Sequence, residues 1–107
     1  MELPDIIKQL LHAQAAFDSK AYSKCFANTA IVFDENETHK GQMEIMKWNE
    51  KTNLKYQPPL EPIAWSTIEK LNTLSPKVTG NFPGSPIVLK YQFKLNNGCI
   101  ESLKITS

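Results

Sequence analysis

An aspartate at the end of a short apolar run is the first candidate for chemistry in this sequence. The run from Ala30 to Asp34 is β-branched and aromatic, which is typical of a strand. Side chains alternate along a strand, so Asp34 shares a face with Val32. If Val32 faces the core, Asp34 points into the same interior, where desolvation would raise the pKa of its carboxyl group and suit a general base. Alternatively, Asp34 opens the acidic turn that follows it and is fully solvated.

Two further side chains are candidate partners for this base. Tyr91 lies in an alternating apolar segment, where its hydroxyl group either donates to a developing oxyanion or belongs to the core with its hydrogen bond satisfied. His39 follows Asp34 in an expected loop, and a loop that folds back would bring it to the pocket mouth, where the two groups would share a proton. The other interpretation of His39 is an exposed loop histidine.

Four residues are candidates for ligand binding. Gln14 interrupts the apolar face of the first predicted helix, so it is either a buried amide that needs partners or a polar group presented to a ligand. Tyr22, Trp48 and Phe93, together with Tyr91, would line a pocket suited to an apolar or aromatic small molecule. The same aromatic residues are also what an ordinary core of this size contains.

Helical periodicity in the first half of the chain would position several of these residues. The spacing of apolar side chains predicts a helix from Pro4 to Phe17, with the proline in the first turn. Asp18 or Ser19 would cap a short second helix. Its inward residues would be Ala21, Tyr22, Cys25 and Phe26. A third helix follows Gly41, carries Trp48, and is expected to end near Tyr56, ahead of a prolyl pair.

Beyond the prolyl pair the periodicity becomes that of an antiparallel sheet. The clearest strand runs from Ile87 to Leu95, with apolar residues on one face and Lys90, Gln92 and Lys94 on the other. Asn97-Gly98 then predicts a tight hairpin into a last strand that contains Ile100, Leu103 and Ile105. Weaker strand patterns cover Ile63–Ile68 and Thr73–Phe82.

Length and charge limit the classes of partner. The chain has 107 residues, which predicts one domain over residues 1–107 with one core. Its net charge is +1, so the chain lacks the excess of positive charge with which proteins bind a phosphate backbone, and we expect no nucleic-acid partner. All twelve basic residues are lysines, so an anion would have to be bound by lysine, by the backbone or by a helix N-terminus.

Targeting and cofactor signals are missing from the sequence. The N-terminus has no signal-peptide pattern, and no apolar run is long enough to cross a membrane, so we expect a cytoplasmic protein with no membrane partner. Cys25 and Cys99 lack metal-ligand spacing and are expected to be reduced thiols. We therefore expect neither a metal nor another cofactor.

Several segments together resemble the SnoaL-like members of the nuclear transport factor 2-like superfamily. The matching segments are Phe17–Tyr22, Cys25–Asp34, Lys40-Gly41 with the following helix, and Gly80–Gly98. The resemblance implies an α+β fold, a cystatin-like roll in which a cone-shaped, curled antiparallel sheet wraps around three helices of the N-terminal half. It also implies an internal pocket and a homodimer formed across the outer sheet face.

The resemblance leaves the activity open, because this superfamily contains isomerases, polyketide cyclases, dehydratases, binding subunits and a transport factor. Asp34 stands where the ketosteroid isomerase branch looks to carry its general base. That branch also uses a tyrosine on the first helix and a protonated carboxylic acid on a late strand. The corresponding positions in this sequence fall near Leu10 and near Tyr91. One donor instead of two argues against steroid isomerase activity. The open possibilities are a cofactor-free isomerase, cyclase or hydratase, a non-catalytic small-ligand carrier, and a homodimeric interaction module.

Overall fold

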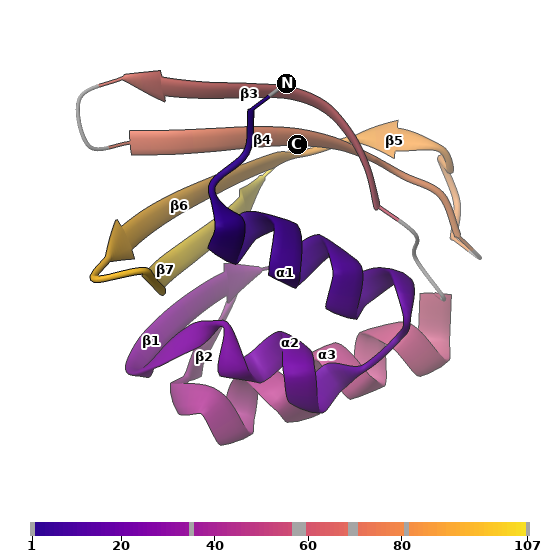
Figure 1. The fold of residues 1–107 in the computed structure, drawn as a ribbon. Helices are drawn as coiled ribbons and strands as arrows, with labels where there is room; N and C mark the ends of the chain where they lie inside the picture. The colour runs from indigo at the N-terminus through magenta and orange to yellow at the C-terminus, as the bar shows by residue number, and fades with distance from the viewer. Residues whose placement is uncertain (1, 35, 57–59, 69–70, 81, 107) are drawn as a thin grey trace.

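A single curled sheet wraps around the helices of this protein (Figure 1). The structure, a computed structural model, describes residues 2–34, 36–56, 60–68, 71–80 and 82–106. Within these residues the helices come first and most of the strands follow, with the β1–β2 hairpin between the second and third helices. This is the α+β roll that the sequence predicts.

Helices α1 (Asp5–Ala15) and α2 (Ser19–Lys24) form the N-terminal part. The buried face of α1 contains Ile7, Leu10, Ala13 and Gln14. The helix ends two residues before the predicted limit, because Phe17 has a left-handed backbone with φ of 53° and cannot continue a helix. Asp18 caps α2, since its carboxylate accepts a hydrogen bond from the Ala21 backbone N–H at 3.0 Å.

The next elements are the hairpin of β1 (Phe26–Asp34) and β2 (Glu37–Lys40), followed by α3 (Gly41–Tyr56). Strand β1 is longer than predicted and begins at Phe26, which we had expected on the second helix. The segment after β1, for which the sequence predicts a loop or a hairpin, forms a hairpin, since Val32 pairs with His39 and Asp34 with Glu37 in antiparallel register. Gly41, with φ of 81°, allows the sharp turn from β2 into α3.

The sheet has the strand order β2-β1-β7-β6-β4-β3, with β5 paired to β4. The remaining strands are β3 (Leu60–Ile68), β4 (Leu71–Val78), β5 (Ile87–Val88), β6 (Lys90–Asn96) and β7 (Cys99–Thr106). Among the described residues, every strand pair is antiparallel except β1 with β7, which is parallel. Strand β7 therefore connects the β1–β2 hairpin to the rest of the sheet.

The strand predicted from Ile87 to Leu95 is divided at Leu89, whose backbone N–H donates to the carbonyl of Pro76 at 3.0 Å. Its predicted faces are confirmed, because Tyr91 and Phe93 are buried whereas Lys90 and Lys94 are exposed. Asn97 and Gly98 form the predicted tight turn with φ of 52° and 75°. The prolyl pair at 58–59, and residue 81 of the segment predicted to extend β4, lie outside the described residues.

One hydrophobic cluster joins α1, α2, α3 and the concave side of the sheet. Its fully buried large side chains include Ile7, Leu10, Phe26, Phe93 and Leu103. Among the described residues, no helix has the length and apolar composition needed to cross a membrane.

Candidate functional site

A cavity of about 370 Å³ lies between the helices and the concave face of the sheet. Its apolar lining consists of Trp48, Leu60, Val78, Phe82, Ile87, Leu89 and Ile105. Its polar lining consists of Gln14, Tyr22, Asp34, Asn49, Thr52, Tyr91 and Thr106. An apolar enclosure with a few converging polar groups is typical of a small-molecule site.

Asp34 contributes the carboxylate of this cavity. It lies at the end of β1 and on the same face as Val32, which is fully buried, so the alternation along the strand directs both side chains inward. The indole Nε1–H of Trp48 donates a hydrogen bond to Asp34 Oδ2 at 3.3 Å. Asp34 is half-buried. The carboxylate is therefore oriented by α3 at the cavity wall.

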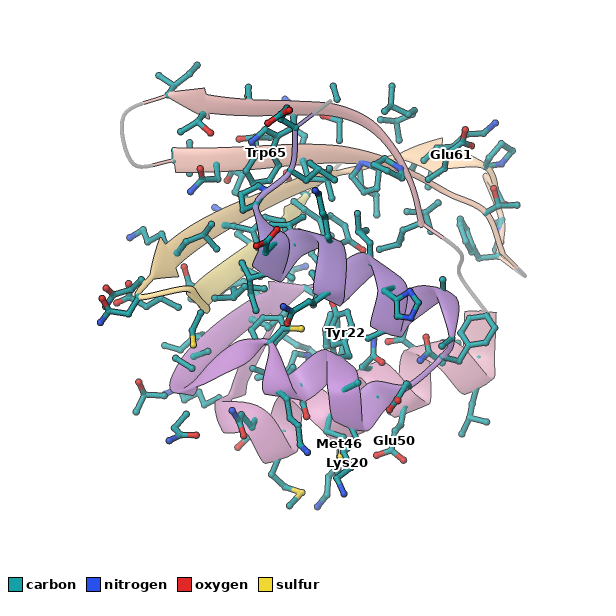
Figure 2. All side chains as sticks on the ribbon, viewed as in Figure 1. Lys20, Tyr22, Met46, Glu50, Glu61 and Trp65 are labelled. Atoms are coloured by element: carbon teal, nitrogen blue, oxygen red, sulfur yellow. The ribbon has the colours of Figure 1, made fainter. Side chains whose placement is uncertain are left out.

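Two tyrosines face the same carboxylate. Burial raises the pKa of Tyr91, and the negative charge of Asp34 raises it further. Burial likewise raises the pKa of Tyr22 well above its ordinary value, with smaller contributions from Tyr91 and Asp34. Figure 2 shows Tyr22 in the middle of the molecule, between the helices and the sheet. Both hydroxyl groups consequently stay protonated at neutral pH and can act as hydrogen-bond donors.

A buried polar network closes the cavity on the helical side. Gln14 Nε2 donates to Asn53 Oδ1 at 2.8 Å, and Asn49 Nδ2 donates to Gln14 Oε1 at 2.9 Å. Ser19 Oγ and Asn53 Nδ2 both donate to Asn49 Oδ1, at 2.7 and 3.0 Å. All four residues are buried, so their mutual hydrogen bonds offset the cost of removing these groups from water. The network ties α1, α2 and α3 together.

The structure brings five of the seven predicted site residues to the cavity: Gln14, Tyr22, Asp34, Trp48 and Tyr91. Phe93 lies elsewhere, because it is fully buried in the core, where its ring packs between those of Trp65 and Tyr91. His39 is also outside the cavity lining. Its position on β2 differs from the loop expected from the sequence.

His39 instead lines a second, outer hollow of about 430 Å³. Its ring stacks on Trp48, with centroids 5.3 Å apart. Its Nε2 atom is buried, has no hydrogen-bond partner among the described residues, and lies 3.9 Å from Glu37 Oε2. His39 therefore supports the far side of Trp48, whose Nε1–H is directed toward Asp34.

Sequence reasoning missed Asn49, Thr52 and Asn53, which α3 places on its inner side. The asparagines are four residues apart, which puts them on one helix face, and a buried Gln14 requires partners. That combination was a usable signal. The apolar lining from Leu60 and Val78 had no such signal, because it depends on how the sheet curls. Among the described residues, no group of three or more His, Cys, Asp or Glu side chains could hold a metal ion.

Comparison with solved structures places this fold among known ones. A provisionally named polyketide cyclase from Sinorhizobium meliloti has a TM-score of 0.93 and 34% sequence identity, over 97% of this chain and 95% of that one. A nuclear transport factor 2-like protein of unknown function from Cytophaga hutchinsonii has a TM-score of 0.78 and 18% identity, over 94% and 85% of the two chains.

A third structure comes from Catenulispora acidiphila, a protein with a ketosteroid isomerase-like fold in complex with trimethylamine. Its TM-score is 0.86 at 16% identity, over 99% of this chain and 87% of that one. At such identities the last two comparisons show a shared fold alone. No family model matches the sequence, and no curated protein sequence matches it either.

Proposed function

Because this chain belongs to the nuclear transport factor 2-like superfamily, in its SnoaL-like branch, we propose that it is a cofactor-free enzyme that acts on a small carbonyl compound. The ligand would be an apolar or aromatic molecule held in the cavity, and Asp34 would be the general base. The observation that carries this proposal is the joint presence of an oriented carboxylate and two buried tyrosines around one apolar cavity. The reaction class would be isomerisation, cyclisation or hydration.

The proposed chemical step is removal of a proton from the carbon next to the carbonyl. The carboxylate of Asp34 takes the proton, the C–H electron pair becomes the C=C bond of an enolate, and the π pair of the carbonyl moves onto its oxygen. A hydroxyl group of Tyr91 or Tyr22 donates a hydrogen bond to that oxygen and stabilises its negative charge. Return of the proton from Asp34 to another carbon, or attack by the enolate on a second carbonyl, would complete an isomerisation or a cyclisation.

Tyr22 supplies the second hydrogen-bond donor that the sequence analysis lacked. From the sequence, Tyr91 was the single donor available to stabilise an enolate, whereas two tyrosines line the cavity with Asp34. The second tyrosine is on α2 and not on the first helix. Gln14 is a weaker donor candidate, because its amide is already engaged with Asn49 and Asn53.

The proposal is tested by exchange of carbon-bound hydrogen. Aryl ketones are incubated with the protein in deuterated buffer, and deuterium incorporation next to the carbonyl is followed by NMR. We expect exchange with the wild-type protein and its loss in Asp34→Asn. Leu89→Trp serves as a cavity-blocked control, because Leu89 lines the cavity and a larger ring there would fill it.

A carboxyl NMR titration of Asp34, with Asp34→Asn as the reference for assignment, complements this assay. Titration above the ordinary aspartate pKa of about 4 supports the base role. Titration at or below that value, with no exchange on any ketone, contradicts it. Binding of a neutral fluorescent probe without exchange would then favour the non-catalytic carrier. The trimethylamine complex of the Catenulispora acidiphila protein is consistent with small-ligand binding in this fold.

Homodimerisation across the outer sheet face remains a prediction. Lys90, Lys94 and Lys104 are exposed on that face, and Gln92 is half-buried there. Such a polar face would form a modest interface, and a two-fold axis through it would bring lysines together. Light scattering at several concentrations measures the mass directly, and a monomer at all of them would contradict the predicted dimer.

A further inference from the structure

A row of lysines borders the outer hollow beside the cavity. Lys47, Lys51 and Lys55 are four residues apart on α3, so their side chains leave the same side of the helix. All three are exposed and line the hollow of about 430 Å³. Like charges at this spacing oppose helix stability. A ligand of opposite charge would relieve that repulsion.

This outer hollow, which we call the lysine groove, adjoins the cavity. Asp34, Trp48 and Thr52 line both hollows, so these three side chains form their common border. A molecule whose apolar part lies in the cavity would therefore extend into the lysine groove. The two regions differ in chemistry, because the cavity lining is mainly apolar and the groove lining is mainly charged.

The acidic residues of the groove have partners other than Lys47 and Lys51, and Asp34 accepts its hydrogen bond from Trp48. Glu44 Oε1 accepts a hydrogen bond from the Lys40 backbone N–H at 2.8 Å, and Glu37 lies beside His39. Within the part of the chain that the structure describes, no carboxylate oxygen lies within 4 Å of the ammonium nitrogen of Lys47 or Lys51. These two charges are therefore available to a ligand.

From this arrangement we propose that the ligand of the cavity carries an anionic oxygen group, such as a carboxylate, which Lys47 and Lys51 bind in the lysine groove. The inference rests on the proposed small-molecule function of the cavity. Lysine provides the charge because the chain contains no arginine. The carboxylate of Asp34 would repel an anion at short range, so the anionic group lies on the lysine side of the common border. A carbonyl near Asp34 and an anion near Lys51 would define both ends of the ligand.

A matched pair of fluorescent probes tests this inference. 8-Anilinonaphthalene-1-sulfonate and N-phenyl-1-naphthylamine share the same aromatic rings, and only the first carries a negative group. Both are titrated against the full-length protein at low and at physiological ionic strength. We expect the sulfonate to bind more tightly than the neutral probe, with an advantage that decreases as salt increases.

The variants separate the lysine groove from general surface charge. The double variant Lys47→Gln/Lys51→Gln is expected to weaken binding of the sulfonate about tenfold and to leave the neutral probe unchanged, since exposed ion pairs contribute modestly. The control is Lys20→Gln/Lys24→Gln on α2, which changes the net charge equally. Figure 2 places Lys20 on the outer side of the helices. Glutamine retains high helix propensity, so both variants should fold.

Each outcome decides the inference. A sulfonate-specific loss in the groove variant alone supports it, and equal losses in both double variants overturn it. Retained binding of the neutral probe with no lysine effect overturns this inference but leaves the cavity function intact. If neither probe binds, both proposals fail together. If inorganic phosphate binds the groove as tightly as the sulfonate does, the groove binds a free oxyanion, and the anion does not belong to the cavity ligand.

Discussion

Two groups of polar side chains around α3 differ in how they are satisfied. Asn49 and Asn53 form a buried network with Gln14 and Ser19, in which the side chains bond to one another. Trp48 instead orients Asp34 toward a cavity of about 370 Å³, which the network borders through Gln14 and Asn49. The network holds the three helices together, whereas the groups around Asp34 leave space for another molecule.

This difference distinguishes buried polar groups that stabilise the fold from buried polar groups that can bind a ligand. Closed networks contribute stability and specificity to the packing, because each donor already has an acceptor within the protein. A carboxylate and hydroxyl groups around an open space can exchange partners with a ligand. Variants of the groups around Asp34 should therefore change the reaction more than the stability, and variants in the network should do the reverse.

The largest expected effect is on the reaction, in Asp34→Asn. Replacing the proposed base with an amide should lower the rate of hydrogen exchange about 10³-fold, within the range for general bases. The unfolding midpoint in urea should change little, because an asparagine oxygen can still accept from Trp48 Nε1. A large loss of stability with a small loss of rate would place Asp34 with the structural network.

Tyr91→Phe should have the next largest effect. Removing one oxyanion donor typically lowers the rate about 10²-fold, and the buried ring itself is kept. The rate constant for exchange under saturating ketone measures this effect. Tyr22→Phe is the matched comparison, and the larger loss of the two would identify the main donor. Unchanged rates in both would remove the tyrosines from the proposed step.

Asn53→Ala breaks the network at a residue outside the cavity lining. The change removes the acceptor of Gln14 Nε2 and one donor to Asn49 Oδ1, so unfolding in urea should show a loss of about 2 kcal/mol. The exchange rate should stay within about twofold of wild type, since Asn53 is not part of the cavity lining. Asn28→Ala, at an exposed position on β1, is the control and should be neutral.

The last expected effect is absent at neutral pH and is a loss of stability at alkaline pH. Burial raises the pKa of Tyr22 and of Tyr91, so above the unfolded-state pKa of about 10 the folded protein binds more protons than the unfolded chain. Stability is fully present below that pH and falls as pH rises, by about 1 kcal/mol per pH unit for each tyrosine. Urea unfolding at increasing pH measures this slope, which should become shallower in Tyr91→Phe. An unchanged slope in that variant would contradict a neutral, buried Tyr91.

Much of the local structure follows from residue order. The alternation from Ile87 to Leu95 predicted the inward faces of β5 and β6, and Asn97-Gly98 predicted the turn to β7. The end of α1 was misplaced, because the left-handed backbone of Phe17 has no signal in a pattern of apolar spacing. The sequence pattern also places Phe26 on the second helix, because a short apolar segment fits both the helical period and the two-residue period of a strand.

The sequence by itself indicated an α+β fold, the shared strand face of Val32 and Asp34, and the need of Gln14 for partners if it is buried, because these depend on periodicity and on the chemistry of single side chains. Only the tertiary structure decided that Trp48 meets Asp34, that Tyr22 and Tyr91 share one cavity, and that Phe93 is excluded from it. It also decided that β1 pairs in parallel with β7, and that three lysines line the outer hollow beside the cavity. The physical reason is that these contacts join segments far apart in the chain. Their geometry depends on the curl of the sheet and on helix packing, which no local pattern encodes.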